Sequence, residues 1–140
     1  MSAKVTVKTS MKQADQICAA LEAMGVPANM IQRHPDGKEI DGYRGKQWGK
    51  AEILIPKSWH GGYSDIGFAR QEDGTYAAIL DHIDEYGACR KVGKEGAGSF
   101  SQLTGQWYAA TTAQKTLQTQ GFQAHIQQDG KNLKVLAQQW

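Results

Sequence analysis

The sequence lacks any long hydrophobic run, and none approaches the roughly 20 apolar residues that a membrane-spanning helix needs. It also begins without the apolar core of a signal peptide, so we expect no membrane partner and a cytoplasmic location. Cysteine is scarce, since Cys18 and Cys89 are the only two. Two cysteines are too few for a disulfide scaffold, and reduced thiols are the expected state.

An excess of either charge sign is also absent, because 16 basic and 14 acidic residues leave a formal charge of +2. This near balance argues against a protein whose whole surface binds a polyanion, although it permits a local basic patch. The 140 residues have an ordinary apolar content of 40%. We therefore expect one folded domain over residues 1–140 with a core of its own.

A strong β-hairpin signal lies between Tyr63 and Asp81. Asp73-Gly74 marks its turn, because glycine readily takes the positive φ that a tight hairpin turn needs. On both sides of that turn apolar residues recur at every second position, as in half-buried strands, namely Ile66, Phe68, Tyr76, Ala78 and Leu80. We place this hairpin at the centre of the fold.

Two amphipathic helices are predicted. The first runs from about Met11 to Met24, with Ser10 and Gln13 spaced as a capping box and Gly25 as the left-handed cap. The second runs from about Ser99, its capping residue, to Gln120. Its apolar stripe should be buried against the sheet and comprises Phe100, Leu103, Trp107, Ala110, Ala113 and Leu117.

Further strands are predicted where apolar residues alternate or cluster. They lie around Val5, over Glu52–Ile55, and on both sides of Asp129-Gly130, which forms a second hairpin. Each predicted helix ends at a glycine and leads through an extended stretch to Asp-Gly. We therefore predict an α+β fold, with an antiparallel sheet built from hairpins and two amphipathic helices packed on one face.

Loops are predicted between these elements. Pro35-Asp36-Gly37 indicates a turn, and Gly42 to Gly49 a glycine-rich loop. Residues 82–98 are predicted to form a long surface loop with a short element near Glu85 to Val92. Its glycine-rich end, Gly93 to Ser99, is interpreted as a hinge or cap loop, with anion binding at the next helix as the alternative.

Several short motifs occur together in a fixed order, namely Gly42-Tyr43-Arg44-Gly45, Ala51, Tyr63, Asp65-Ile66-Gly67-Phe68, Asp81, Tyr108, Gln120-Gly121-Phe122, Asp129-Gly130 and Trp140. With this set the chain resembles an uncharacterised family of cyanobacterial and algal-plastid open reading frames, domain of unknown function twelve-fifty-seven. The family pattern has an uninterrupted Tyr-Asp-Ile-Gly-Phe, whereas Ser64 is inserted here. The resemblance implies no established activity.

A candidate ligand site is centred on Arg44, which stands in a glycine turn. Such a guanidinium fork suits a carboxylate or a phosphate, and a purely structural turn is the alternative. Asp65 and Asp81 are nearly equidistant from Asp73-Gly74, so hairpin pairing should make them neighbours that repel unless a cation such as Arg44 lies between them. The predicted ligand-binding residues are Tyr43, Arg44, Trp59, Asp65 and Asp81.

The favoured function is a small non-enzymatic cytoplasmic binding or accessory module, with an unknown protein or a small anionic ligand as its partner. No catalytic residue, metal ligand or cofactor is assigned. One alternative is a nucleic-acid-binding module that uses the basic and aromatic loops at 38–59, where aromatic rings lie among lysines. Another is a small enzyme or metal protein centred on Asp81 and His82.

Overall fold

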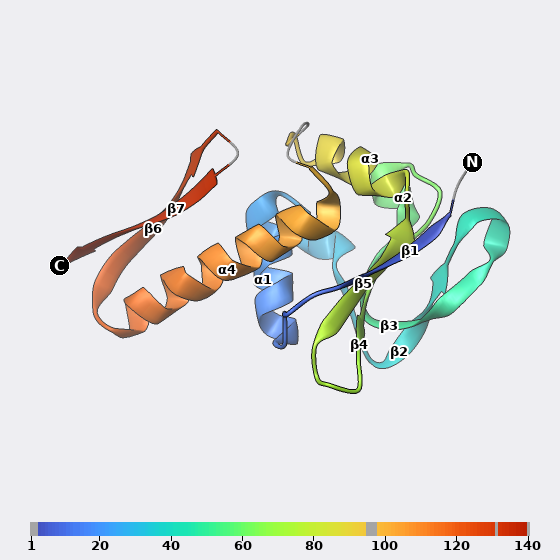
Figure 1. The fold of residues 1–140 in the computed structure, drawn as a ribbon, viewed down its shortest axis with the longest axis horizontal. Coiled ribbons are helices and arrows are strands. Elements are labelled where there is room, and N and C mark those ends of the chain that lie inside the picture. Colours follow the sequence, from blue (N-terminus) through green and yellow to red (C-terminus); the bar gives the residue numbers. More distant parts are fainter. Residues whose placement is uncertain (1–2, 95–97, 131, 140) are drawn as a thin grey trace.

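The computed structural model describes residues 3–94, 98–130 and 132–139. Residues 95–97 of the glycine-rich segment and Trp140 of the family pattern lie outside the described residues. The described chain forms a five-stranded antiparallel sheet and a separate two-stranded sheet (Figure 1). Helices α1 and α4 pack against these strands, which confirms the predicted α+β class.

The five-stranded sheet has the order β1-β5-β4-β3-β2. Its strands are β1 (Lys4–Lys8), β2 (Gln32–Asp41), β3 (Gln47–Ile55), β4 (Ile66–Arg70) and β5 (Tyr76–Asp81). The predicted central hairpin is β4–β5, in which Phe68 pairs with Ala78 and Gly74 has a φ of 85° at the turn. The N-terminal strand β1 pairs antiparallel with β5 and forms one edge of the sheet.

The β2–β3 hairpin differs from the predicted loops. Strand β2 continues through Pro35-Asp36-Gly37, where the pairing with β3 shifts register and Gly37 has a φ of 82°. The predicted turn is therefore an irregularity within a strand, because one positive-φ glycine lets the strand absorb extra residues. The predicted loop over Gly42–Gly49 shortens to a 3-10 turn at Tyr43–Gly45, and β3 begins at Gln47.

The helices are α1 (Ala14–Met24), α2 (Lys57–His60), α3 (Asp84–Lys91) and α4 (Phe100–Thr119). Gly25 ends α1 with a φ of 119°, and the Ser99 hydroxyl accepts the N–H of Gln102 at the start of α4, as predicted. The predicted capping box is wrong, because α1 begins at Ala14 and its cap residue Gln13 makes no side-chain capping bond. No helix in the described ranges is both long and apolar enough to cross a membrane.

The main core lies on one face of the five-stranded sheet. It joins side chains of α1 and α4 to strand residues, among them Ile17, Leu21, Ile53, Phe68, Leu80, Phe100 and Trp107. Figure 1 shows α1 and α4 between the sheet and the C-terminal hairpin of β6 (Phe122–Asp129) and β7 (Asn132–Gln139). Trp107 is buried as predicted, whereas Ala113 is exposed.

Candidate functional site

The two predicted aspartates are buried, and their partners are backbone groups. Asp65 Oδ2 accepts the N–H of Asp41 and Asp65 Oδ1 accepts the N–H of Lys57, both at 2.9 Å. Asp81 Oδ1 accepts the N–H of Ile83 at 3.0 Å, and Asp81 Oδ2 has no hydrogen-bond partner among the described residues. Both carboxylates therefore fix the paths of loops that follow strands.

Arg44 does not lie between these carboxylates. Continuing the β4–β5 register by two residues beyond Gly67 and Ile79 does bring Asp65 opposite Asp81, as predicted. Arg44, however, is exposed in a left-handed turn (φ 57°), with its guanidinium 5.1 Å from the ring centroid of Tyr43. No ion pair within the described ranges joins it to a carboxylate, so the predicted Arg44 bridge is wrong. Backbone N–H groups satisfy Asp65 instead.

Tyr43 and Trp59 have different environments. Tyr43 is half-buried and meets Tyr63 edge to face, with ring centroids 5.2 Å apart. Trp59 is only 9% exposed and belongs to the main core. Tyr43 therefore borders the loop before β4, whereas Trp59 holds the short helix α2 against the core. A ligand-binding role for either remains a prediction.

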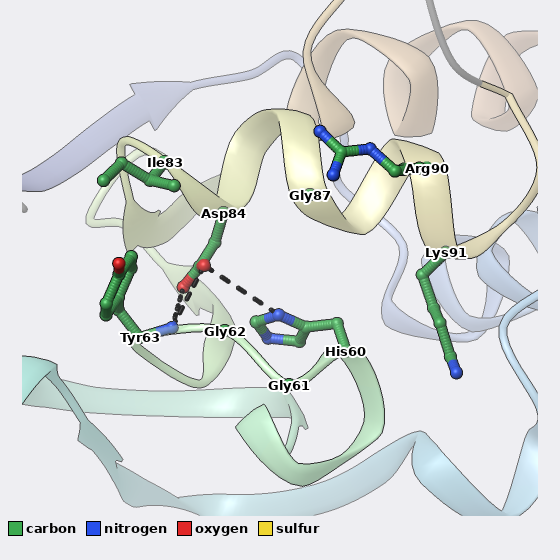
Figure 2. Close-up of a pocket in the computed structure, with 9 residues that line it drawn as sticks. All are labelled: His60, Gly61, Gly62, Tyr63, Ile83, Asp84, Gly87, Arg90 and Lys91. Carbon is green, nitrogen blue, oxygen red and sulfur yellow. Dashed lines mark hydrogen bonds and ion pairs between the residues drawn. The ribbon is translucent and has the colours of Figure 1, made fainter.

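A cavity of about 550 Å³ opens beside this loop, between α2 and α3 (Figure 2). We call it the His60–Asp84 cavity; its lining residues are His60, Gly61, Gly62, Tyr63, Ile83, Asp84, Gly87, Arg90 and Lys91. Figure 2 shows Tyr63 and Ile83 at one end, Arg90 and Lys91 at the other, and the imidazole facing the carboxylate between them. The loop after α2 and the whole length of α3 thus form its walls.

Asp84, the first residue of α3, fastens that helix to the loop. Its Oδ2 accepts the N–H groups of Tyr63 and Ser64 at 3.0 and 2.8 Å, and the Ser64 hydroxyl lies 3.2 Å from it. The next residue, Glu85, accepts the N–H and hydroxyl of Ser101 at 2.8 and 2.6 Å, which ties α3 to the start of α4. Two buried carboxylates therefore position α3 from both sides.

His60 is the second buried polar group of the cavity wall, with a side chain only 1% exposed. Its Nε2 lies 3.0 Å from the Ser64 carbonyl oxygen, so Nε2 carries the proton and donates. Nδ1 then presents a lone pair 4.0 Å from Asp84 Oδ1 and has no hydrogen-bond partner in the described chain. Burial lowers the pKa of His60, an effect that the Asp84 charge opposes, so the neutral form is favoured.

Two glycines shape this wall in different ways. A Cβ on Gly62 would overlap the Asp84 carboxylate and lie 2.5 Å from His60 Nδ1, so this close approach requires glycine. Gly87 lies within α3, and a Cβ there would meet nothing within 4 Å. Gly62 therefore brings the imidazole and the carboxylate together, whereas Gly87 leaves the cavity open.

The stretch at 38–59 presents few open aromatic faces. Trp59 is in the core, and Trp48 is half-buried over Gly42, where a Cβ would overlap the indole ring. One lysine of this stretch is also engaged in an ion pair, since Lys57 Nζ lies 2.6 Å from Asp41 Oδ2. Base stacking needs exposed rings, so no feature of this stretch specifically favours nucleic acid, and that alternative remains a prediction.

Asp81 and His82 face different surroundings. Asp81 is fully buried, whereas His82 is exposed and meets Tyr86 edge to face, with ring centroids 5.9 Å apart. In the part of the chain that the structure describes, no group of three or more His, Cys, Asp or Glu residues could hold a metal ion. The adjacency of these two residues in sequence therefore does not produce a joint site.

Sequence reasoning placed His60 next to Trp59 in a loop expected to contribute to binding, and Asp84 in the charged segment after Asp81, but it included neither among the predicted ligand-binding residues. The available signal was the combination of a histidine with two glycines in His60-Gly61-Gly62. Adjacent glycines allow main chain and side chains to approach closely. Its partner Asp84 lies 24 residues later, and no local sequence pattern identifies it. Only the tertiary fold brings α3 over this loop.

Comparison with known proteins gives one match. A family model described as a protein of unknown function (DUF1257) matches residues 20–135, a range that includes both walls of the His60–Asp84 cavity. Neither the curated proteins nor the solved structures gave a match to the chain.

Proposed function

The chain belongs to the DUF1257 family of unknown function, and on that premise we propose that it is a small non-enzymatic binding module with a small anionic ligand. The ligand would occupy the His60–Asp84 cavity. The observation that carries this proposal is a cavity with rigidly held polar walls and two cationic side chains, Arg90 and Lys91, at one end. Its volume of about 550 Å³ lies in the range of small-molecule sites.

The charges of the lining residues favour an anion. Lys91 is exposed at the end of α3, next to Arg90 in the sequence, so an acidic group there meets the positive charge of Lys91. The opposing charge, Asp84, already accepts hydrogen bonds from two backbone N–H groups and lies beside the Ser64 hydroxyl. Those bonds satisfy the oxygens of the carboxylate, so Asp84 does not need a cationic ligand as its partner.

The hydrogen bonds of the same residues support binding rather than catalysis. A general acid or base needs an atom within reach of its substrate. His60 Nε2 donates to a main-chain carbonyl, and His60 Nδ1 is enclosed by protein atoms. Asp84 holds the loop to α3 through both of its oxygens. These groups maintain the shape of the cavity.

A cytoplasmic location is part of the proposal and rests on the two cysteines. Cys18 and Cys89 are both free thiols. Burial raises the pKa of the Cys18 thiol, and it raises the pKa of the Cys89 thiol to about 11. Thiols with such pKa values stay protonated, which fits packing roles in a reducing compartment.

Filling the cavity tests the proposal. The Gly87→Leu substitution places a side chain in open space on the cavity wall, and a helical leucine should not weaken α3. We expect citrate, succinate or lactate, titrated into the ¹⁵N-labelled full chain, to shift the amide resonances of residues 60–63 and 83–91. Gly87→Leu should abolish these shifts, and Lys91→Ala should weaken binding by about two- to fivefold.

The matched control is Gly105→Leu, on α4. Gly105 is also a helical glycine with open space at its Cβ, but it does not line this cavity. Wild-type shifts that persist in Gly87→Leu would contradict the proposed site. The absence of shifts with all three acids in the wild type would contradict the proposed ligand class.

A further inference from the structure

A second cavity lies on the sheet side of α1 and shares no lining residue with the His60–Asp84 cavity. Its volume is about 370 Å³, and it is lined by Ala14, Arg33, Pro35, Glu52, Arg70 and Tyr76. We propose that this cavity is a binding site for hydrogenphosphate, which carries both acceptor oxygens and a P–OH donor. The proposal is independent of the function proposed above.

Two guanidinium groups supply the positive charge. Arg70, at the end of β4, makes no side-chain hydrogen bond or ion pair with any residue in the described ranges, so its whole fork is available. Arg33, on β2, uses Nη1 to bond Asp15 Oδ1 at 2.8 Å and also interacts with the Cys18 thiol, so part of its charge and of its five N–H donors is engaged within the protein. Arginine forks match the oxygens of phosphate in pairs, so the available donors fit this anion.

Tyr76, which lines the cavity, provides a third donor. It is only 6% exposed, with its N–H bonded to the Met11 carbonyl and its own carbonyl accepting the Thr9 hydroxyl. Its phenolic hydroxyl, in contrast, has no hydrogen-bond partner among the described residues. This hydroxyl is not among the fully enclosed polar atoms without a partner, so it is accessible from the cavity and can donate to a bound anion.

Glu52 determines which anion fits. Its Oε2 accepts the N–H of Arg70 at 2.9 Å, which fixes the carboxylate at the cavity wall. A carboxylate repels a fully deprotonated anion such as sulfate, whereas it accepts a hydrogen bond from the P–OH of hydrogenphosphate. The combination of two guanidiniums with one carboxylate therefore selects an oxyanion that keeps a proton.

The start of α1 adds a weaker contribution. Ala14 is the first helical residue, and the preceding Gln13 makes no side-chain capping bond. First-turn N–H groups and the helix dipole favour an anion at such an end. Asp15 in the same turn opposes this effect in part, although its charge is paired with Arg33. The arginines, Tyr76 and Glu52 thus carry the proposal.

Calorimetric titration of the full chain with inorganic phosphate and with sulfate, at pH 7.5 and constant ionic strength, tests it. We expect phosphate to bind at least about tenfold more tightly than sulfate, as one charge-assisted hydrogen bond implies. Arg70→Gln and Tyr76→Phe should each weaken phosphate binding, Arg70→Gln by about tenfold. Glu52→Gln should strengthen sulfate binding and reduce the preference to about threefold or less.

The matched control is Arg44→Gln, because Arg44 is also an exposed arginine without a carboxylate partner but lies outside this cavity. It should leave the phosphate affinity unchanged. Circular dichroism of each variant establishes that it is folded. Equal affinities for phosphate and sulfate in the wild type, or no phosphate binding at all, would overturn the proposal. The same holds if Arg70→Gln binds phosphate as well as Arg44→Gln does.

Discussion

At the scale of single residues, Ser64 connects the end of β5 to the start of α3. Its hydroxyl accepts the N–H of Asp81 at 2.8 Å and lies 2.9 Å from the Asp65 carbonyl and 3.2 Å from Asp84 Oδ2. This serine thus connects Asp65, Asp81 and Asp84 through main chain and side chain. The charged bridge predicted from Arg44 concerned only Asp65 and Asp81.

His60 gives the protein a pH dependence of stability. Burial lowers its pKa in the folded state, whereas in the unfolded chain the value stays near 6.5. Below about 6.5 the unfolded state therefore binds more protons than the folded state, and the free energy of unfolding falls as the pH falls. Above that pH both states are neutral at this residue, and the effect disappears.

Urea denaturation of the wild type and of His60→Gln at pH 7.5 and pH 5.5 measures this contribution. Because the variant lacks the imidazole, the wild type should lose more stability than the variant between these two pH values. An equal loss in both proteins would show that the buried imidazole does not titrate in this way. Comparing changes with pH also cancels the constant cost of the substitution itself.

At the scale of elements, tertiary contacts decide which of two cap signals is used. Ser99 caps α4, whereas the segment before α1 is held in a non-helical conformation. There the Tyr108 hydroxyl accepts the N–H groups of Lys12 and Gln13 at 3.3 and 3.2 Å. Because a side chain of α4 satisfies these N–H groups, the helix begins at Ala14, and Ser10 has no capping function.

The two serines therefore form a matched pair of substitutions. Ser99→Ala should lower the free energy of unfolding by about 1 kcal/mol, the usual cost of removing an N-cap side chain. Ser10→Ala, at an exposed position, should change it by less than about 0.5 kcal/mol. Chemical denaturation measures both values, and equal costs would mean that Ser10 contributes to the start of α1 after all.

Sequence predicted the elements better than the site. Period-two alternation and Asp-Gly turns are local signals, so both hairpins and α4 were predicted close to their observed bounds. The partners of buried charges are not local, however. Asp65 bonds the N–H of Asp41, and Asp84 bonds that of Tyr63, across 24 and 21 residues. No spacing rule predicts such pairs, so neither the His60–Asp84 cavity nor the exposed position of Arg44 was predictable.

At the scale of the whole molecule, the two hairpins with Asp-Gly turns are supported unequally. The β4–β5 hairpin has a paired strand on each side, β3 and β1. The β6–β7 hairpin forms a sheet of its own and lies against α4, at the end of the molecule farthest from the larger sheet (Figure 1). A two-stranded hairpin is marginally stable alone, so its stability depends mainly on its packing against α4.

Hydrogen–deuterium exchange should reveal this difference. We expect amides of β6–β7 to exchange about tenfold faster or more than amides of β4–β5, because local opening of the outer hairpin leaves the main core intact. The two hairpins are compared in one sample, so intrinsic exchange rates are the only correction needed. Equal protection of both would indicate that α4 and its hairpin open only when the whole protein unfolds.

The pairing of β1 with β5 has a consequence for biosynthesis. Lys4 lies opposite Asp81, so within the five-stranded sheet the strand that is synthesised first pairs with the strand that is synthesised last. At a translation rate of about 5–20 residues per second, the separation of 77 residues between them takes on the order of 4–15 s to synthesise. Throughout that interval β1 has no partner strand, and the five-stranded sheet can close only after β5 has emerged. A nascent chain arrested before this point retains an unpaired N-terminal segment that a chaperone can bind.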